Sequence, residues 1–386
     1  MRVCLVYDCL YPHTVGGGER WYRNLSERLA TAGHEVTYLT LRQWSRGEAV
    51  DLPGTRVIAV GPRMPLYTAS GRRRVLPPLV FGAGVLWHLA RHGRGYDIVH
   101  SAAFPYFSLL AAAALRRFGR YRLVVDWFEV WSRDYWRAYL GRIGGPIGNT
   151  VQAACLRVPQ AALCMSRLYE RRLRDLGVRG PVTLLPGAYV GSLEAAEPEP
   201  ADDVVVFAGR HIPEKRAPAV VGAVAYARRQ LGTLRSVIFG DGPERGAVLA
   251  LRERHGLQGV VEVPGFVDAD DIDAAFRRAL CMILPSRREG YGMVVIEAAR
   301  HGTPSIVVDG PDNAAVELVA EGVNGTVAAS ASPEDLGEAI LRIHGAGEAL
   351  RASTRAWFAE QAPSSSLERS FERVVETYGE LASARS

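Results

Sequence analysis

The start of the chain alternates between short apolar runs and a helical segment, and this alternation limits the possible folds strongly. Val3–Tyr7 is typical of a buried strand, and Glu19–Ala32 repeats apolar residues at the spacing of one helical face. Gly33 ends the helical pattern, and a second apolar run follows at Val36–Leu39. A strand, a helix and a strand in this order predict two parallel strands joined by a right-handed crossover.

The same alternation continues through both halves of the chain. In the first half, the further runs that predict strands are Arg56–Val60, Ile98–Ser101, Leu123–Val125 and Ala162–Met165. In the second half, they are Val204–Phe207, Ser236–Phe239, Val260–Val263, Cys281–Leu284 and Ser305–Val308. Since 386 residues suggest two domains, we predict an α/β protein of two doubly wound domains with a cleft between them.

The segment between the two halves differs from both in composition. Tyr189–Asp203 is poor in apolar residues and contains two prolines and several acids, which is typical of a linker. We therefore predict an N-terminal domain over residues 1–188, a linker over 189–203 and a C-terminal domain over 204–364.

The last part of the chain predicts an amphipathic helix over residues 365–386. Ser365 and Glu368 have the spacing of a capping box, in which each side chain bonds a backbone N–H of the other residue. The apolar residues that follow share one helical face, so the helix needs a surface to cover. These residues alone leave open which domain provides that surface.

The chain is mildly basic, with a formal net charge of +5. An ordinary arginine-rich surface explains this charge, and attraction to nucleotide phosphates, lipid phosphates or a membrane is the alternative. No basic tail, zinc spacing or aromatic RNA-binding signature is present, so nucleic acid is not an expected partner. Five cysteines without a CxxC pair predict buried free thiols in a reducing cytosol and no metal site.

The sequence shows neither a signal peptide nor a segment that predicts a membrane span. Met1–Leu10 is interrupted by charges, and the apolar stretch Val75–Ala90 is shorter than the roughly 20 residues that a spanning helix needs. We therefore expect a cytoplasmic protein. The basic run Arg72–Arg74 precedes Val75–Ala90, which indicates either peripheral contact with the inner membrane face or a solvated loop beside a core helix.

Gly16–Gly18 follows a predicted strand and opens a predicted helix. Glycines let the backbone approach a ligand closely, and a helix N-terminus favours an anion. The segment lacks the ending of a P-loop, the GxGxxG pattern, and the acid that dinucleotide sites place about 20 residues further on. An anion site and an ordinary tight turn both fit.

Two cations share one loop in the second half of the chain. Arg210 and Lys215 lie within Gly209–Lys215, after the predicted strand Val204–Phe207. Open α/β sheets bind ligands at this end of their strands, and two cations there suit a diphosphate. A solvated basic loop is the alternative.

The segment Arg287–His301 places two carboxylates around a turn from strand to helix. Glu289 lies on the loop, where it is suited to sugar hydroxyls. Glu297 lies in the helix among apolar residues, where a buried carboxylate needs hydrogen bonds such as those of ribose hydroxyls. The helix N-terminus at Gly292–Met293 is suited to phosphate. A glutamate paired with a nearby arginine is the alternative.

These segments, taken in order, resemble the retaining glycosyltransferases of the GT4 family, which have the GT-B fold. Gly16–Arg20 resembles the family's glycine loop, Gly209–Lys215 its phosphate loop, and Glu289–Glu297 its E-x7-E motif. Further landmarks of the family resemble Gly240–Arg245, Pro264–Val267 and Asn324–Gly325. The resemblance covers nearly all of the chain.

The resemblance implies roles for individual residues. Arg210, Lys215 and Glu289 would be the catalytic residues, with the two cations on the donor diphosphate and the glutamate on the donor sugar. Glu297 would bind the ribose, and the backbone near Phe266 would face the nucleobase. The implied donor-binding residues are Gly17, Gly18, Gly209, Arg210, Lys215, Phe266, Glu289, Tyr291, Gly292, Met293, Val294 and Glu297.

The same resemblance implies an activity. A hexosyl group would move from a nucleoside diphosphate sugar, UDP- or GDP-linked, to a hydroxyl of a small-molecule, glycan or lipid-linked acceptor, with retention. No metal or other cofactor is expected, because cationic side chains and helix dipoles would neutralise the diphosphate. The N-terminal domain would bind the acceptor and the C-terminal domain the donor, and the C-terminal helix would cross back to the N-terminal domain.

One position departs from the family pattern. Many members carry an HxH pattern at the end of the fourth N-terminal strand, where this chain has His100 and Ala102. The missing second histidine indicates an altered sugar environment, such as a deoxy or modified sugar. His100 is also explained as a residue that merely ends a strand.

Aromatic and acidic residues cluster after Leu123–Val125. Aromatic faces stack on sugars and carboxylates bind hydroxyls or amines, so this cluster predicts part of the acceptor site. The candidate acceptor residues are His100, Asp126, Trp127, Glu129 and Trp131. A loop that contributes partly to the core and partly to the surface is the alternative.

Three other functions are alternatives to glycosyl transfer. A nucleotide-sugar epimerase of the GT-B fold is the closest alternative. A nicotinamide-dependent oxidoreductase is disfavoured by the missing GxGxxG pattern and ribose acid. A binding protein with a decayed site is disfavoured because Arg210, Lys215, Glu289 and Glu297 are all present.

Overall fold

A computed structural model describes residues 1–383 except 46, 49, 69, 70 and 72. Ala384–Ser386, at the end of the predicted C-terminal helix, and Arg72 of the basic run lie outside the described residues. The chain divides into two compact units. Unit 1 comprises residues 1–68, 72–186 and 368–386, and unit 2 comprises residues 69–71 and 187–367.

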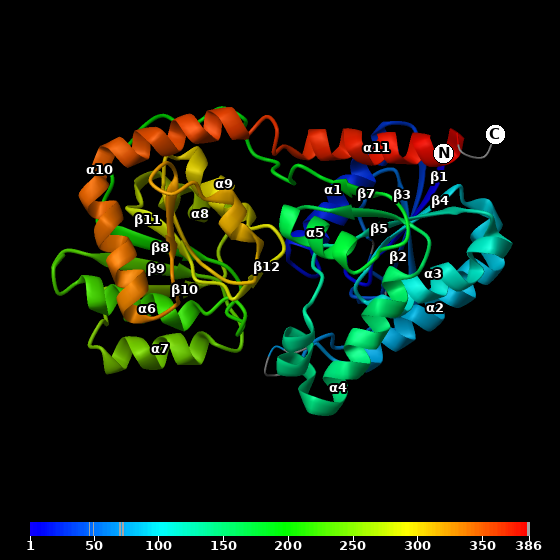
Figure 1. Cartoon of the computed structure of the whole chain (residues 1–386), viewed down its shortest axis with the longest axis horizontal. Helices are drawn as coiled ribbons and strands as arrows, with labels where there is room; N and C mark the ends of the chain where they lie inside the picture. The colour runs from blue at the N-terminus through cyan, green and yellow to red at the C-terminus, as the bar shows by residue number, and fades with distance from the viewer. Residues whose placement is uncertain (46, 49, 69–70, 72, 384–386) are drawn as a thin grey trace. The chain divides into compact units, whose positions relative to one another are not determined.

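Unit 1 is built on a parallel sheet with seven strands among the described residues (Figure 1). In sheet order these are β3 (Thr55–Gly61), β2 (Glu35–Leu41), β1 (Arg2–Val6), β4 (Ile98–Ala102), β5 (Arg122–Asp126), β6 (Ala161–Cys164) and β7 (Val182–Leu184). Its helices are α1 (Gly17–Thr31), α2 (Leu76–His92), α3 (Tyr106–Gly119), α4 (Arg133–Leu156), α5 (Arg167–Asp175) and α11 (Leu367–Ser383), with a 3-10 turn at Gly93–Gly95.

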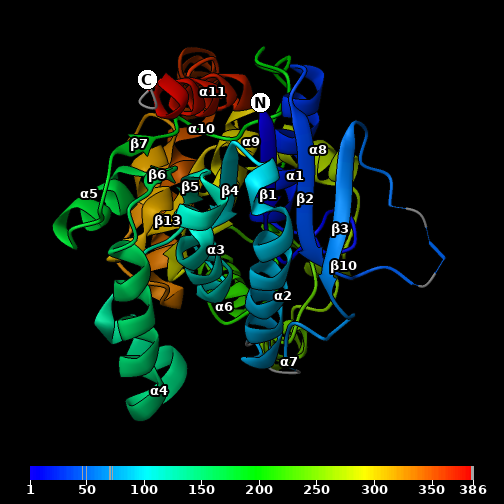
Figure 2. The same ribbon diagram turned by 90° about the vertical axis from the view of Figure 1, so that its right-hand side faces the viewer.

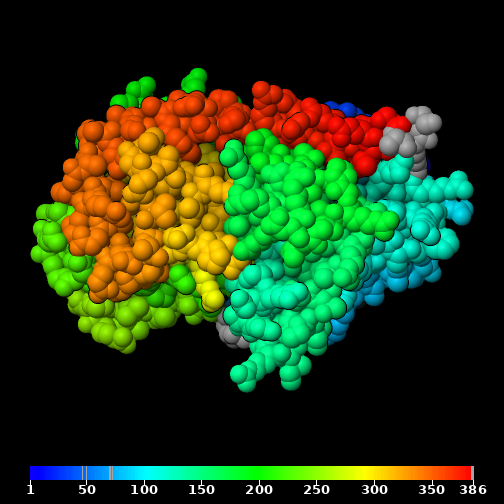
Figure 3. Space-filling view, in the orientation of Figure 1, coloured from blue at the N-terminus to red at the C-terminus, as the bar shows by residue number. Residues whose placement is uncertain are grey.

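The central strands of unit 1 are apolar on both faces because helices cover both sides of a parallel sheet. Val3, Leu5 and Val6 of β1 are completely buried, and α1 buries Trp21 and Leu29 at its predicted apolar face. The helices α2 and α3 pack against each other beside the sheet (Figure 2). The helix α4 projects from the body of unit 1 (Figure 3).

Unit 2 repeats the architecture with a six-stranded parallel sheet in its described part. In sheet order the strands are β10 (Val261–Gly265), β9 (Arg235–Phe239), β8 (Val204–Ala208), β11 (Cys281–Leu284), β13 (Ser305–Val308) and β15 (Gly325–Ala328), with a separate pair β12 (Arg288–Glu289) and β14 (Asp312–Asn313). The helices are α6 (Ala217–Ala227), α7 (Arg245–Arg254), α8 (Ala269–Arg278), α9 (Met293–Arg300) and α10 (Pro333–Gln361), with a 3-10 turn at Ala314–Leu318. The predicted class of two Rossmann-like α/β domains is confirmed.

The segment Tyr189–Asp203, which we expected to link the domains, belongs to unit 2. Tyr189 is buried, its ring lies edge-to-face against Phe358 with centroids 5.7 Å apart, and its carbonyl oxygen accepts a 2.8 Å hydrogen bond from the N–H of Leu367. Ala196 N–H and Asp202 N–H also donate to the carbonyl oxygens of Arg300 and Arg278, each at 2.8 Å. Most of this anchoring uses backbone groups, so the polar composition of the stretch does not reveal it.

The predicted capping box at Ser365 is wrong by one residue, since α11 begins at Leu367. The Glu368 carboxylate instead accepts a 2.5 Å hydrogen bond from Arg28 of α1, which fastens α11 within unit 1. Partial burial favours a higher pKa for Glu368, but the hydrogen bond from Arg28, a backbone hydrogen bond and the charge of Arg28 together hold this pKa below its usual value.

The five cysteines are free and buried, as predicted. Burial raises the pKa of Cys155 and Cys281, which keeps these thiols protonated. None of the described helices combines enough length and apolarity to cross a membrane.

Candidate active site

Several loops of unit 2 meet at the carboxyl edge of its sheet. Neighbouring parallel strands β9, β8, β11 and β13 end on the same edge, so the loops that follow them lie side by side. These loops are residues 209–216 after β8, 240–244 after β9, 285–292 after β11 and 309–311 after β13. Backbone bonds connect them: His211 N–H donates to Asp241 O at 2.8 Å, and Arg287 N–H donates to Glu214 O at 2.8 Å.

Lys215 and Glu289 come together at this edge. The Lys215 Nζ donates a 2.5 Å hydrogen bond to Glu289 Oε1, and Ser286 Oγ donates to the same oxygen at 2.7 Å. Glu289 is only 7% exposed, so its charge needs these donors. The structure therefore joins the predicted phosphate loop to the predicted sugar carboxylate.

The loop that carries Glu289 is held in place by Asn313. The Asn313 Nδ2 donates to Ser286 O at 3.2 Å and to Val308 O at 2.7 Å, and β12 pairs with β14. Ser286 and Asn313 did not feature in the predicted site. Their signal in the sequence is modest, since each is only a polar residue near the end of a buried strand.

The N-terminus of α9 lies next to Glu289 in sequence and presents backbone N–H donors. Gly292 precedes the helix with a φ of 104°, and a Cβ there would lie 2.6 Å from the Cβ of Ala315. Only glycine fits this position without strain. The first turn of α9 contains no acidic side chain, so its N–H groups and helix dipole favour an anion.

Positive charge concentrates around this anion site. Arg216 adopts a left-handed conformation with a φ of 51° just before α6. Burial, and then the neighbouring charge of Arg287, lowers the pKa of Arg216. Neither arginine is among the predicted site residues, although Arg287 begins the predicted segment Arg287–His301 and Arg216 directly follows Gly209–Lys215. Arg210, which we did predict, is exposed at the same loop, and Gly209 is half-buried.

The remaining predicted donor residues line the same part of unit 2. Phe266 follows β10 and is 68% exposed, which leaves its ring free to stack on a planar group. Tyr291 is half-buried, and burial raises its pKa to about 12. Glu297 is half-buried rather than buried as expected, and Met293 and Val294 are half-buried too.

Gly17 and Gly18 belong to unit 1, where α1 begins at Gly17. A Cβ at Gly17 would meet nothing within 4 Å, whereas one at Gly18 would lie 2.8 Å from the hydroxyl of Tyr7. The carboxylate of Glu19 folds back over Gly16, so it already faces the start of this helix. The glycine loop is therefore less open to an anion than the start of α9.

A buried ion pair lies at the carboxyl edge of the sheet in unit 1. Arg73 donates to the carboxylate of Asp8, which is completely buried. Burial opposes the charge of Arg73, but Asp8 acts together with Cys9, Tyr67 and Tyr7 to raise the pKa of the guanidinium. The basic run Arg72–Arg74 is thus not a uniform membrane-facing patch, because the side chain of Arg73 is directed into unit 1.

Aromatic rings continue from this ion pair. The guanidinium of Arg73 lies 5.2 Å from the ring centre of Phe104, and Phe104 stacks on Trp131 with centroids 5.9 Å apart. The half-buried Trp131 donates its indole N–H to Glu129 at 2.8 Å. Asp8, Arg73, Phe104, Trp131 and Glu129 form a continuous set, which we name the acceptor wall.

The other predicted acceptor residues face the interior. Trp127 is completely buried and donates its indole N–H to Gln160 at 2.9 Å, so it belongs to the core. His100 is also completely buried: its Nδ1 lies 2.7 Å from the Tyr378 hydroxyl and its Nε2 lies 3.0 Å from Asp126 Oδ2. Asp126 additionally accepts from the indole of Trp21. Burial prevents direct contact between these side chains and a sugar.

Ala102, the position that departs from the HxH pattern, is buried at the end of β4 and pairs in register with Asp126. Among the described residues no group of three or more histidine, cysteine or acidic side chains is arranged to hold a metal ion.

Two family models divide the chain between them. The one described as Glycosyltransferase Family 4 matches residues 15–189, and the one described as Glycosyl transferases group 1 matches residues 193–356. The chain is a GT4-type glycosyltransferase. The family predicted from the glycine loop, the phosphate loop and the E-x7-E segment is thereby confirmed.

Individual relatives are distant. One phosphatidylinositol N-acetylglucosaminyltransferase subunit, from Arabidopsis thaliana, is 25% identical over 78% of this chain and 66% of its own length. The D-inositol 3-phosphate glycosyltransferase of Segniliparus rotundus is 30% identical over 41% of this chain and 36% of its own. The chain thus spans less than two thirds of these curated relatives.

Solved structures show the GT-B fold over the whole chain. Sucrose-phosphate synthase from Thermosynechococcus elongatus superposes with a TM-score of 0.81 at 20% identity and covers 99% of both chains. Anabaena Alr3699/HepE in complex with UDP superposes with a TM-score of 0.73 at 17% identity, over 98% of this chain and 100% of the other.

Proposed function

We propose that the protein transfers a hexosyl group, ordinary or modified, from a nucleoside diphosphate sugar to a hydroxyl acceptor with retention at the anomeric carbon. The observation that carries the proposal is the Lys215–Glu289 hydrogen bond beside the N-terminus of α9, in a chain of the GT4 type. The UDP bound to the HepE neighbour and the activities named for the relatives support a nucleotide-sugar donor.

In this proposal unit 2 binds the donor. Arg210 and Lys215 neutralise the diphosphate, together with Arg216 and the N–H groups at the start of α9. Glu289 accepts hydrogen bonds from sugar hydroxyls, and its bond to Lys215 couples the sugar position to the phosphate position. The remaining donor contacts are those of Glu297 with the ribose and of the exposed Phe266 with the base.

The proposed chemistry takes place on one face of the sugar. The bond between the anomeric carbon and the diphosphate oxygen breaks, and a bond to the acceptor oxygen forms on the same face. The acceptor proton passes to the departing diphosphate oxygen. Since the leaving group gains negative charge in the transition state, the cations and amide groups at the carboxyl edge stabilise the transition state more than the ground state. We propose that no metal takes part.

The acceptor wall of unit 1 is the proposed acceptor site. The half-buried ring of Trp131 offers a stacking face, and Glu129 offers a carboxylate to a hydroxyl or amine. A small-molecule or glycan acceptor fits this set. A lipid-linked acceptor at the inner membrane face is supported by Leu76 and Trp87 of α2, whose side chains are 59% and 58% exposed.

The proposal is tested by incubating the protein with a panel of UDP- and GDP-linked sugars and candidate acceptors, and by measuring the released nucleoside diphosphate and the mass of the product. Nuclear magnetic resonance of the new glycosidic bond gives the anomeric configuration. Arg210→Ala with Lys215→Ala should abolish transfer. Arg235→Ala with Arg254→Ala removes two exposed cations elsewhere in unit 2 and should leave transfer unchanged.

Near-normal turnover by the Arg210/Lys215 double variant would contradict the proposal. A new stereoisomer of the sugar nucleotide without release of diphosphate would instead identify the epimerase alternative. An inverted anomeric centre would keep glycosyl transfer but exclude the same-face route.

A further inference from the structure

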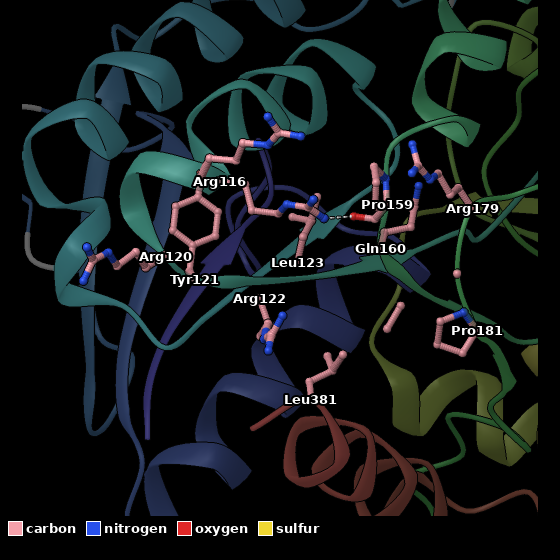
Figure 4. Close-up of a pocket in the computed structure, with 13 residues that line it drawn as sticks. Arg116, Arg120, Tyr121, Arg122, Leu123, Pro159, Gln160, Arg179, Pro181 and Leu381 are labelled. Carbon is pink, nitrogen blue, oxygen red and sulfur yellow. Dashed lines mark hydrogen bonds between the residues drawn. The ribbon is translucent and has the colours of Figure 1, made fainter. Parts of the chain in front are cut away.

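A pocket of about 890 Å³ in unit 1 is lined by five arginines (Figure 4). Arg116 and Arg117 lie in the last turn of α3, Arg120 follows that helix, Arg122 begins β5, and Arg179 lies before β7. We name this site the arginine pocket. None of the residues assigned above to donor or acceptor binding lines it.

The arginine pocket lies at the amino edge of the sheet. Arg122 is the first residue of β5, Gln160 directly precedes β6, and Arg179 lies before β7. Asp126 ends β5 at the opposite edge, which is about 13 Å away at about 3.3 Å per residue. The pocket is therefore distinct from the carboxyl edge, where the acceptor wall lies.

The charged residues that line the described part of the pocket are all arginines. No carboxylate occurs among the described residues that line it. The pKa of Arg116 is lowered by burial and then by the charges of Arg117, Arg122 and Arg179. Like charges at this density repel one another, so an anion that enters the pocket relieves an unfavourable interaction.

The backbone around the pocket is fixed by short contacts. Arg116 donates a 2.5 Å hydrogen bond to Pro159 O, drawn in Figure 4, and Gln160 N–H donates to Arg179 O at 3.0 Å. The chain passes so closely that a Cβ at Gly180 would lie 1.9 Å from Gln160 O. These contacts fix the Arg116 side chain and the backbone at Arg179, which lowers the cost of ordering these two residues around a ligand.

Arg120 occupies a position where glycine would be more stable. It follows α3 with a φ of 60°, a left-handed conformation that commonly ends helices and that glycine adopts without steric cost. The arginine at this position is strained, yet it adds a cation to the pocket.

We propose that the arginine pocket binds a small molecule that carries two or more adjacent phosphate groups. Guanidinium groups match phosphate oxygens in a planar, two-bond geometry, and five of them exceed what one phosphate can use. The pocket has the volume of a small-molecule site, for which about 300–1,000 Å³ is usual.

Helix α11 connects this pocket to the interior of unit 1, so binding at the pocket affects the contacts that the helix makes there. Leu381 of α11 lines the pocket, and one turn earlier the same helix carries Tyr378, whose hydroxyl bonds His100. A ligand that contacts this part of α11 will therefore reduce the opening of the helix and slow the exchange of its amide hydrogens.

The test uses tripolyphosphate as the probe and isothermal titration calorimetry of the full chain in the Arg210→Ala/Lys215→Ala background, which removes two cations from the loop 209–216 of unit 2. We expect one bound tripolyphosphate per chain. Replacing the three exposed lining residues, Arg117→Gln/Arg120→Gln/Arg179→Gln, should weaken binding at least tenfold. The matched control, Arg63→Gln/Arg133→Gln/Arg142→Gln, removes the same charge elsewhere in unit 1 and should change affinity less than twofold.

A single substitution distinguishes a loss of binding from a loss of folding. Arg120→Gly should weaken binding while the thermal midpoint stays equal or rises, because it removes both a cation and the backbone strain. In the presence of tripolyphosphate, hydrogen exchange should slow at Arg116–Arg122 and around Gln160.

Three results would overturn the proposal. Equal losses in the pocket variant and the matched control would mean that only overall charge attracts the probe. Protection confined to other parts of the chain would place the probe elsewhere. Binding to phosphatidylglycerol vesicles without binding to tripolyphosphate, lost in the pocket variant, would identify a membrane surface as the partner.

Discussion

Replacement of Lys215 by alanine tests most directly what stabilises the loops at the carboxyl edge of the sheet in unit 2, which we name the donor edge. The substitution removes the lysine donor to Glu289 Oε1, while the Ser286 hydroxyl still donates to the same oxygen at 2.7 Å. Breaking a buried ion pair costs about 3–5 kcal/mol, because the remaining charge stays desolvated. Since the Lys215 side chain is 22% exposed, water replaces part of the interaction, and we expect a loss of about 2–3 kcal/mol.

The loss is measured by urea unfolding at pH 7, followed by circular dichroism and, separately, by tryptophan fluorescence. Two units can unfold in two steps, so the free energy is taken from the transition that Lys215→Ala displaces. The control is the double variant Lys215→Ala/Glu289→Gln, in which the buried group is neutral. We expect this variant to recover about 1 kcal/mol relative to Lys215→Ala.

A loss below about 0.5 kcal/mol for Lys215→Ala would show that Glu289 does not depend on the lysine. A double variant no more stable than Lys215→Ala would show that the cost does not arise from an uncompensated charge. Either result would refute the account of the donor edge given above.

Three other predictions concern separate parts of the molecule. Gly292→Ala should destabilise unit 2 by about 2 kcal/mol, measured by urea unfolding, because of its positive φ and the close Ala315; an unchanged midpoint would contradict this. Trp131→Ala should raise the KM for the acceptor at least fivefold while the KM for the donor stays constant, and equal changes in both would exclude an acceptor role. Burial lowers the pKa of His88 to about 4, so the stability that its neutral form contributes is complete above the unfolded pKa near 6.5. As pH falls from about 6.5 to about 4, unit 1 should lose up to about 3 kcal/mol, measured by thermal unfolding, and His88→Gln should remove most of this dependence.

The sheets were predictable because most strands are continuous apolar runs. Cys281–Leu284 and Ser305–Val308 have the bounds that the sequence predicts. The edge strands Val182–Leu184 and Gly325–Ala328 were missed, because three or four residues that include threonine or glycine carry too little apolar signal. Edge strands are defined mainly by the neighbour with which they pair.

The donor edge was more predictable than the acceptor side for a related reason. Lys215 and Glu289 each follow a strand, and parallel strands bring their ends together whatever the side chains are. Asp8 and Arg73 have no such guide in the sequence, since their pairing depends on the path of a long loop. Trp127 and Trp131 look equivalent in the sequence, but only the packing around Gln160 shows that Trp127 is internal.

The two chain segments of unit 1 have a consequence for the order of synthesis. A nascent chain that has reached residue 186 contains every strand of the first sheet but lacks α11. The hydroxyl that holds His100 and the carboxylate that holds Arg28 emerge from the ribosome only after all of unit 2 has been made. The first unit to be translated is therefore the last to be completed. The hydrogen bond between the buried His100 and Tyr378 forms only after α11 has been synthesised.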